Sequence, residues 1–546
     1  MSSITINAFG GSIPRMEPHL LPASASERAL DCKLTSGALA SWREPLYVRG
    51  LQEGTQMAVR IGDCWHEYTV PVEVAYGSTT CSEVYITGLD AFPVAVDVSG
   101  PDCTPYVRRL GVPCGGDPPT VMPGAENGAA AKDIESRTYA YQYVDALGNR
   151  GALSRASAPI LVKDGQTVAV TGWDIPAPEW DVVAVRIFRA VSSVGSSMPT
   201  IANTMQSPMS TTWMFVEEVA LTAPVVTDSR KNEELDTAAE EDVVVPPPPN
   251  LRGIVHVGAM NCLAGFVGNR VYFSENNHYH NWPHYMDLDD NVCALAENNG
   301  IVYAATDGHP YAIRALADCN SAACRQAVRL PVAYPMVGCG NLAMTTLPQG
   351  VVYPSHRGMV MLSDTNVPAL ITHSLYSEDD WQALVPQSIT SAFYGGKLFV
   401  FGEGGAFAVS LRGTGEDGWQ MDSHTELSDT GAKAVTTRQG DLYLIKNGAL
   451  WQWDRGATLR PHEWRSAEYV TNTEVNFGAG HVRVTGGPEY VDVEVDGRPA
   501  LTRTVLTSRQ FRLPNWAVGT RWHVTLRGTG KVVLASLATS MKELRA

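Results

Sequence analysis

A stretch rich in histidine and aspartate comes nearest, by residue type, to a metal site. It holds three histidines followed by three acids: His278, His280, His284, Asp287, Asp289 and Asp290. Structural zinc takes four oriented ligands, and no cysteine lies at close spacing here. A calcium loop of the EF-hand type would need a glycine and a terminal glutamate, which the acidic run lacks. We therefore expect no metal site here, and the sequence indicates no other cofactor.

Cleavage of a sugar chain is the enzymatic alternative. It requires paired carboxylates, or an arginine cluster, that converge on one point. Sialidases contain several copies of an aspartate-box turn. Residues 413–419 resemble this turn only loosely, and the pattern occurs once. The sequence holds neither a G-x-S-x-G nucleophile elbow nor a G-x-x-x-x-G-K-[ST] phosphate loop. We therefore predict no catalytic residues and no enzyme.

Glycine–aromatic units recur along the chain and predict the elements that would carry any site. In five places a glycine is followed, three or four residues later, by an aromatic residue in an apolar run: Tyr272, Tyr303, Tyr353, Phe399 and Tyr443. Four of the units lead into a second glycine turn, at Gly308, Gly358, Gly404 and Gly448. Each unit is typical of a β-hairpin, and a hairpin must stack on neighbours to bury its apolar face. Spacings of 31 to 50 residues match one small sheet per repeat and favour a β-propeller.

The composition agrees with an all-β protein. The 546 residues include 49 glycines and 34 prolines, and only 18% are charged, which suits short strands joined by tight turns. The net charge of −16 disfavours a clamp that grips phosphates, although an acidic conduit would let a nucleic acid slide. The sequence shows no secretory signal and no apolar run long enough to span a membrane, so we expect folding in the cytoplasm.

Changes in composition divide the chain. Proline clusters at residues 113–119 and 246–249 bracket a segment whose hairpin at residues 137–151 and strand at residues 184–189 resemble a fibronectin type III sandwich. We predict an extended N-terminal arm (1–50), the first part of a propeller (51–117), an inserted fibronectin type III-like domain with acidic and proline-rich linkers (118–249), the rest of the propeller (250–455) and a small C-terminal β domain (456–546). The arm either binds a partner or lies as a strand against its own domain.

Charge is unevenly distributed between the parts. Residues 456–546 hold twelve Lys or Arg and eight Asp or Glu, so they carry +4 and the rest of the chain carries −20. Opposite signs at two ends favour head-to-tail contacts between subunits. A solvated basic face is the alternative.

Several segments together resemble one family of virion proteins. They are the opening "NAFGGSIPRMEPHLLP" with "ALDCKLTSGALASWREP", the blade "VGNRVYFSENNHYHNWP", and the ending "WRSAEYV", "VNFGAGHVRV" and "LATSMKEL". These segments resemble the tail nozzle, or tail tubular protein B-like, structural proteins of short-tailed bacteriophages. The resemblance covers most of the chain by pattern and is strongest at the two ends. It also assigns the histidine-rich stretch to a loop after a strand.

This resemblance implies a function in the virion. It implies a homohexameric ring below the tail adaptor protein that continues and gates the DNA exit channel, with DNA passing through without sequence-specific binding. Tail fibre or needle proteins would be further partners, and the resemblance implies no stable membrane insertion. It places contacts between components at the N-terminal arm and the C-terminal domain, and hence partner-interface positions at Phe9, Gly10, Gly11, Pro14 and Arg15. It leaves the residues that line the DNA channel unknown. The alternative is a receptor-binding or sialidase-like, glycan-cleaving propeller.

Overall fold

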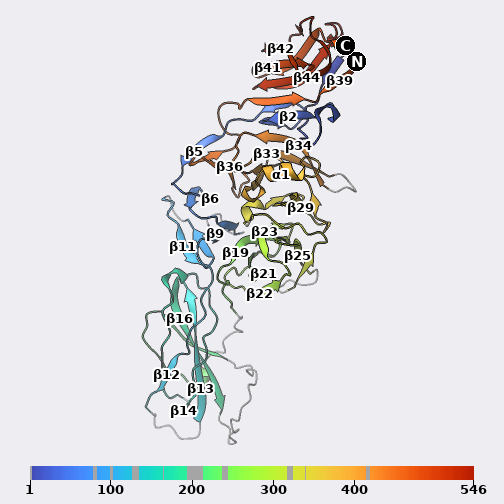
Figure 1. Cartoon of the computed structure of the whole chain (residues 1–546). Helices are drawn as coiled ribbons and strands as arrows, with labels where there is room; N and C mark the ends of the chain where they lie inside the picture. The colour runs from blue at the N-terminus through green and yellow to red at the C-terminus, as the bar shows by residue number, and fades with distance from the viewer. Residues whose placement is uncertain are drawn as a thin grey trace. The chain divides into compact units, whose positions relative to one another are not determined.

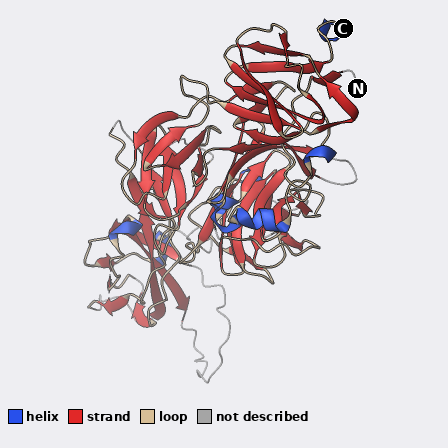
Figure 2. Cartoon of the chain, turned by 45° about the horizontal axis from the view of Figure 1, so that its top comes forward, coloured by secondary structure: helices blue, strands red, loops and turns tan. Residues whose placement is uncertain are grey.

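The computed structural model describes residues 3–77, 83–98, 102–125, 134–163, 165–193, 213–235, 244–316, 324–338, 340–413 and 419–545. Within these ranges the regular secondary structure is almost all strand (Figures 1 and 2), and the one α-helix there is α1 (Glu378–Ala383). Short 3-10 helices lie at η1 (Pro18–Leu20), η2 (Pro178–Trp180), η3 (Asn232–Glu234), η4 (Gly258–Met260), η5 (Asn341–Ala343), η6 (Pro386–Ser388) and η8 (Glu543–Arg545). The chain forms two compact units: Met1–Glu73 with Asp289–Arg314 and Gln326–Ala546, and Val74–Leu288 with Ala315–Arg325.

The predicted glycine–aromatic hairpins are confirmed, and they are blades of a β-propeller. Gly268 and Gly396 have φ values of 60° and 79°, in the left-handed region that glycine adopts without strain, and each turns one strand back on the next. Four of the five aromatic side chains, those of Tyr303, Tyr353, Phe399 and Tyr443, are buried in the sheets. In these four units the repeat in the sequence therefore arises from one hairpin turn and one buried ring per sheet.

The first unit holds most of the blades. The blade of β35, β36 and β37 takes its fourth strand from β5, which pairs with β37 although it lies about 400 residues earlier in the chain. The strands of these blades are β6 (Met57–Ile61) and β7 (Cys64–Tyr68); β23 (Val292–Asn298), β24 (Ile301–Thr306), β25 (Tyr311–Ala315) and β26 (Arg325–Arg329); β27 (Thr345–Leu347), β28 (Gly350–Ser355), β29 (Gly358–Leu362) and β30 (Ala369–Leu370); β31 (Thr390–Tyr394), β32 (Lys397–Phe401), β33 (Ala406–Gly413) and β34 (Trp419–Leu427); and β35 (Lys433–Thr436), β36 (Leu442–Lys446), β37 (Ala449–Gln452) and β5 (Leu46–Gly50).

The second unit holds two further blades and the inserted domain. The blades are β8 (Glu73–Tyr76), β9 (Glu83–Thr87), β10 (Val94–Asp97) and β11 (Tyr106–Arg109), and β19 (Arg252–Val257), β20 (Cys262–Val267), β21 (Arg270–Phe273) and β22 (His284–Asp287). The insert is a sandwich of a three-stranded and a four-stranded antiparallel sheet, as expected for a fibronectin type III-like domain. Its sheets are β12 (Thr120–Pro123), β15 (Val168–Thr171) and β18 (Val226–Asp228), and β14 (Ile160–Lys163), β13 (Ile134–Asp145), β16 (Val182–Ser193) and β17 (Met214–Ala220).

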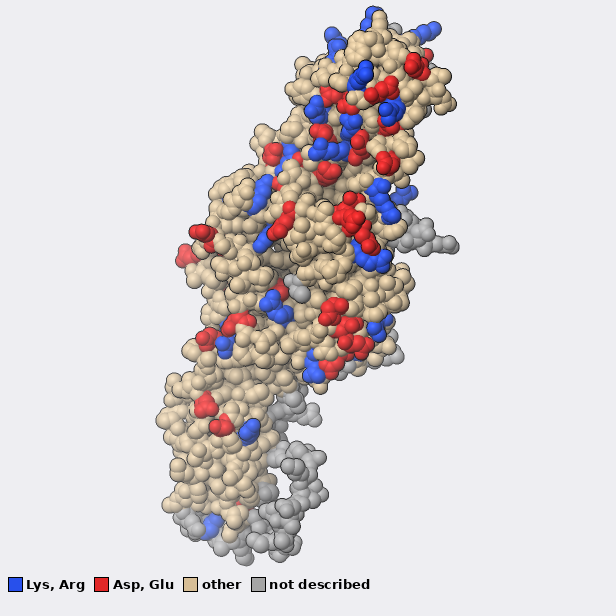
Figure 3. Space-filling model, in the orientation of Figure 1, with Lys and Arg blue, Asp and Glu red and all other residues tan. Residues whose placement is uncertain are grey.

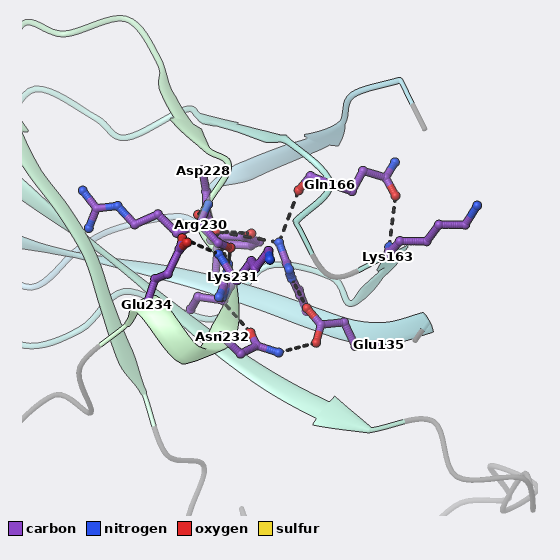
Figure 4. A network of polar contacts seen from close by, with 11 residues as sticks. Glu135, Lys163, Gln166, Asp228, Arg230, Lys231, Asn232 and Glu234 are labelled. Atoms are coloured by element: carbon purple, nitrogen blue, oxygen red, sulfur yellow. Dashed lines mark hydrogen bonds and ion pairs between the residues drawn. The ribbon is translucent and has the colours of Figure 1, made fainter. Parts of the chain in front are cut away.

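The core of the insert contains a buried charge network. Arg137 on β13 and Arg189 on β16 are both fully buried, and Asp228 at the end of β18 is 1% exposed. Arg189 donates a 2.7 Å hydrogen bond to Asp228, and Arg137 donates to Glu135. The close view of Figure 4 shows Asp228 with Glu135 and the polar residues of the segment that follows β18. Buried cations are tolerated here because carboxylates face them.

The C-terminal β domain includes strands from the N-terminus. We expected residues 1–50 as an extended arm, and the described part of them, residues 3–50, contributes strands that pair within their own chain. Figure 1 shows the blue N-terminal strands beside the red C-terminal ones. One sheet holds β3 (Cys32–Leu34), β4 (Leu39–Ser41), β45 (Lys531–Ala538), β40 (Ala479–Thr485) and β43 (Phe511–Arg512), with β1 (Ser3–Ile6) paired to β45. The other continues the blade β31–β34 through β2 (Ser26–Leu30), β38 (His462–Ser466), β44 (Val518–Gly528), β41 (Glu489–Val495) and β42 (Arg498–Val505), with β39 (Tyr469–Asn476) on β44.

Candidate partner interface

The start of the N-terminal segment is anchored inside the C-terminal β domain. Phe9 is 3% exposed, and its ring packs edge-on against Trp464 of β38 with 5.0 Å between the centroids. The indole Nε1 of Trp464 donates a 3.0 Å hydrogen bond to the carbonyl oxygen of Gly10. An aromatic pair of this kind adds about 0.5–1.5 kcal/mol to the burial of its surface. Phe9 therefore holds the segment in place from within the chain.

The two predicted glycines lie where no side chain fits. A Cβ on Gly10 would come within 2.7 Å of the carbonyl oxygen of Ser24. A Cβ on Gly11 would come within 2.3 Å of the backbone nitrogen of His424 and within 2.4 Å of its oxygen. The segment is held there by hydrogen bonds from Ser26 N to Gly11 O and from Ser12 N to His424 O. The reason for both glycines is close backbone approach within the chain.

Replacing Gly11 with alanine should weaken this docking. The new methyl group meets rigid backbone rather than a side chain that can move, so we expect a loss of about 1–3 kcal/mol in the free energy of unfolding. The measurement is urea denaturation together with the rate of proteolysis within the first 20 residues. Gly258→Ala is the matched control, because a Cβ at Gly258 meets nothing within 4 Å. Equal stability of the two variants would contradict the packing argument.

A buried polar triplet fixes the residue after the glycines. Ser12 Oγ lies 2.8 Å from His424 Nδ1, and the OH of Tyr376 lies 2.5 Å from His424 Nε2. Burial lowers the pKa of His424 to about 3, and the rings of Tyr376 and Phe407 pack against the imidazole. The histidine is therefore neutral at physiological pH, with both ring nitrogens engaged. The sequence carried no sign of this triplet, because Ser12 and His424 are 412 residues apart.

The low pKa of His424 predicts a pH dependence of stability. Because the unfolded chain binds a proton near pH 6.5 and the folded chain does so only near pH 3, stability is highest above 6.5 and falls with decreasing pH. The contribution of this histidine approaches a slope of about 1.4 kcal/mol per pH unit. Urea denaturation between pH 7.5 and 5.0 should show a shallower slope for His424→Gln than for the wild type. An unchanged slope would show that His424 titrates normally.

The exposed part of the segment begins at Pro14. Arg15 is tied down by hydrogen bonds from its backbone nitrogen to Leu375 O, at 3.0 Å, and from its Nη1 to His373 O, at 2.6 Å. Four consecutive residues are exposed here: Pro14, Arg15, Met16 and Glu17. Of the five predicted interface positions, Phe9 is buried, Gly10 and Gly11 are half-buried against backbone of the same chain, and Pro14 and Arg15 are exposed. Their contact with a partner protein stays a prediction.

A serine, a histidine and a glutamate form a second buried chain in the same domain. Ser41 Oγ lies 2.9 Å from His462 Nδ1, and His462 Nε2 lies 3.0 Å from Glu489 Oε1. The order resembles the nucleophile, base and acid of a hydrolase. The side chains of His462 and Glu489 are fully buried and Ser41 is 9% exposed, so the three residues lie within the packed domain. The chain of contacts joins β4, β38 and β41 and has a structural role.

The histidine- and aspartate-rich stretch is not gathered around one point. His284 Nε2 contacts Glu275 at 2.7 Å, and Asp287 accepts two hydrogen bonds from Arg270, which holds the pKa of this aspartate below its usual value. The rings of His278 and His280 pack edge-on with centroids 5.7 Å apart. Among the described residues, no three His, Cys, Asp or Glu side chains are placed to hold a metal ion. In the segment that loosely resembles an aspartate box, residues 414–418 lie outside the described residues.

Comparison with known proteins does not assign this chain to a family. No protein-family model matches the chain, and no curated protein matches it. Solved structures with some likeness include BamB from Moraxella catarrhalis, at 10% identity and a TM-score of 0.30, covering 78% of this chain and 93% of that one. Hsv2 from Kluyvelomyces marxianus has 9% identity and a TM-score of 0.23, covering 48% of this chain and 69% of that one. No helix within the described ranges is long and apolar enough to cross a membrane.

Proposed function

We propose that this protein is a non-enzymatic tail nozzle component of a short-tailed bacteriophage. It would act in the virion, after assembly in the host cytoplasm, as a homohexameric ring below the tail adaptor protein. The ring would continue the DNA exit channel and keep it closed until infection, and DNA would pass through it without sequence-specific binding. Tail fibre or needle proteins would be its other neighbours.

One observation carries the proposal. The two chain ends that resemble nozzle proteins fold together, since β1 pairs with β45 along its whole length and β2 pairs with β38. The sheet of β2 and β38 runs on into the blade β31–β34, because β2 also pairs with β34 at Leu30 and Glu426. The segments with the strongest resemblance thus form one body with a blade. A rigid body of this kind suits a ring subunit, which must hold a fixed angle to its neighbours.

Electron microscopy tests the ring. The purified full chain is viewed in negative stain, alone and after mixing with the candidate tail adaptor protein. Six-fold rings with a central hole are the expected result. Single particles under both conditions would remove the main support for the conduit and favour a monomeric propeller, to be assayed next for binding and cleavage of host polysaccharide.

A receptor-binding role for the insert is the second candidate. The sandwich has its own apolar core and exposes large apolar side chains, among them Leu147, Leu161 and Ile175 at 63%, 66% and 70% exposure. The chain enters and leaves it at adjacent points, because a Cβ on Gly111 would lie 2.7 Å from Pro247. Replacing residues 113–243 with a short linker should therefore leave the propeller folded. Virions that assemble normally but no longer adsorb would support this role, and normal adsorption would contradict it.

A further inference from the structure

One outer face of the C-terminal β domain carries positive charge. In β40, Val482 and Val484 point into the core, so Arg483 between them points outward. The next strands follow the same alternation: Phe511 is buried and Arg512 exposed on β43, and Val532 is buried and Lys531 exposed on β45. The register places Lys531 opposite Thr485 and Arg512 opposite Ala479. Three basic side chains therefore share the solvent side of this sheet.

The loop between β42 and β43 extends this surface. Ser508 makes two hydrogen bonds to Val484 of β40. Its Oγ accepts from Val484 N at 3.2 Å and donates to Val484 O at 3.3 Å. The loop therefore lies along the edge of β40 and brings exposed Arg509 close to the sheet. Leu506 in the same loop is 71% exposed, and Val533 on β45 is 37% exposed. We name this surface, made of Arg483, Arg509, Arg512, Lys531, Leu506 and Val533, the basic face.

The charges of the basic face are not neutralised. None of its four basic side chains has a carboxylate partner among the described residues. On the opposite sheet of the same domain three arginines are paired: Arg465 with Glu27 and Glu494, Arg521 with Glu468, and Arg527 with Asp492. Arg498 and Arg503 on β42 are exposed and have no carboxylate partner within the described residues. In Figure 3 both signs are interleaved over the visible side of this domain, and basic side chains line its outline. Four unpaired basic side chains of the last ninety residues thus share one face of the domain.

A complementary acidic patch lies on the blades of the same unit. Helix α1 begins with three exposed acids, Glu378, Asp379 and Asp380, and Figure 3 shows the acidic side chains gathered over it. Exposed Glu403 lies near the end of this helix, because the next residue, Gly404, donates a hydrogen bond to Leu384 O. Within the described residues the one basic side chain paired with this set is Arg357, which contacts Glu378 at 3.0 Å. We name Glu378, Asp379, Asp380 and Glu403 the acidic patch.

We propose that the basic face binds the acidic patch of a second copy of this chain. Guanidinium groups form strong, directional pairs with carboxylates, and Leu506 and Val533 supply apolar contact among them. A polyanion is the less favoured occupant, because the chain as a whole carries −16. The two surfaces differ, so the contact is head-to-tail and closes into a ring if the rotation between copies allows. The inference rests on the proposed ring and names the surfaces that build it.

Charge reversal tests the contact in the full chain. The variant Arg483→Glu/Arg512→Glu/Lys531→Glu should raise the concentration of half-assembly by roughly 100-fold or more, as measured by mass photometry in 50 mM salt. Glu378→Lys/Asp379→Lys/Glu403→Lys should do the same. An equimolar mixture of the two variants should assemble again, because each reversed surface then meets its complement and a six-membered ring can alternate. Restored assembly in the mixture would exclude misfolding as the cause of the losses.

The matched control reverses three exposed basic residues elsewhere. Arg412→Glu/Lys433→Glu/Arg498→Glu changes the net charge by the same amount and should assemble like the wild type. Rings that persist in the basic-face variant would overturn the proposed contact and leave the proposed nozzle function standing. A wild type that stays monomeric with the adaptor would overturn both. Loss of binding to labelled duplex DNA in the basic-face variant, with assembly unchanged, would overturn the contact and identify a polyanion site.

Discussion

Replacing Asp228 with alanine should destabilise the inserted sandwich by about 3–5 kcal/mol, because it leaves two buried guanidinium groups without their shared carboxylate. Asp228 accepts hydrogen bonds from Arg189 at 2.7 Å and from the OH of Tyr139 at 2.8 Å, and Arg137 Nη1 lies 4.0 Å away. Burial and the nearby Asp228 charge raise the pKa of Tyr139, so the phenol stays protonated and donates. No other carboxylate faces both arginines among the described residues. Arg137 keeps Glu135, so Arg189 is the cation that loses its carboxylate.

The effect should be confined to the insert. Hydrogen exchange of β13 and β16 amides in the full chain is the measurement, and exchange there should become faster by the factor that this loss of stability implies. Glu218→Ala is the control on the same sandwich: Glu218 pairs with Arg186 at 3.5 Å, and its side chain is 51% exposed, so its loss should change stability by less than about 1 kcal/mol. Exchange as slow in Asp228→Ala as in the wild type would contradict the central role of Asp228.

Arg460→Ala should have an effect of similar size in the first unit. Arg460 is 4% exposed and donates to Asp31 at 3.1 Å and to Asp429 at 2.6 Å. Its pKa is raised because these two carboxylates outweigh the effect of burial. Without it Asp31 loses its cation, whereas Asp429 keeps Lys446. We expect a loss of about 3–5 kcal/mol in the free energy of unfolding.

Guanidinium chloride denaturation followed by tryptophan fluorescence measures this loss, since the guanidinium of Arg460 lies over the ring of Trp453. Arg455→Ala is the matched control, because Arg455 is 55% exposed and lies 3.6 Å from Asp441. The control should stay within about 1 kcal/mol of the wild type. If Arg460→Ala were equally mild, the joint between the N-terminal strands, the last blade and the C-terminal domain would not depend on this arginine.

The blades were predictable from sequence because their cause is local. A glycine turn such as Gly396 and a buried ring such as Phe399 lie within one hairpin, so their spacing records the fold directly. The role of Gly10 was not predictable in this way. A Cβ at Gly10 would meet the carbonyl oxygen of Ser24, and the carbonyl oxygen of Gly10 accepts from Trp464, 454 residues distant, so both contacts are visible only in the folded chain. Likewise β5 shows no sign in sequence that it completes the blade of β35–β37.

The basic face was partly predictable. The alternation of apolar and polar residues around Arg483 is typical of a strand, and the charge count indicated a basic end of the chain. Which arginines are neutralised depends on pairs such as Arg465 with Glu27, which come from opposite ends of the sequence. The charge count of a segment therefore predicts the sign of its net charge, but it does not predict which face of the folded domain carries that charge.

The pairing of the first strands with the last ones sets an order for synthesis. Strands β1 to β5 leave the ribosome first, yet their partners β37, β38 and β45 lie at residues 449–538. At roughly 5–20 residues per second, these early strands wait between about half a minute and two minutes for their partners. Their edges stay open to other chains throughout that time. The last blade therefore cannot close before residues 449–452 have been synthesised, and the C-terminal β domain cannot close before residues 531–538 have been synthesised.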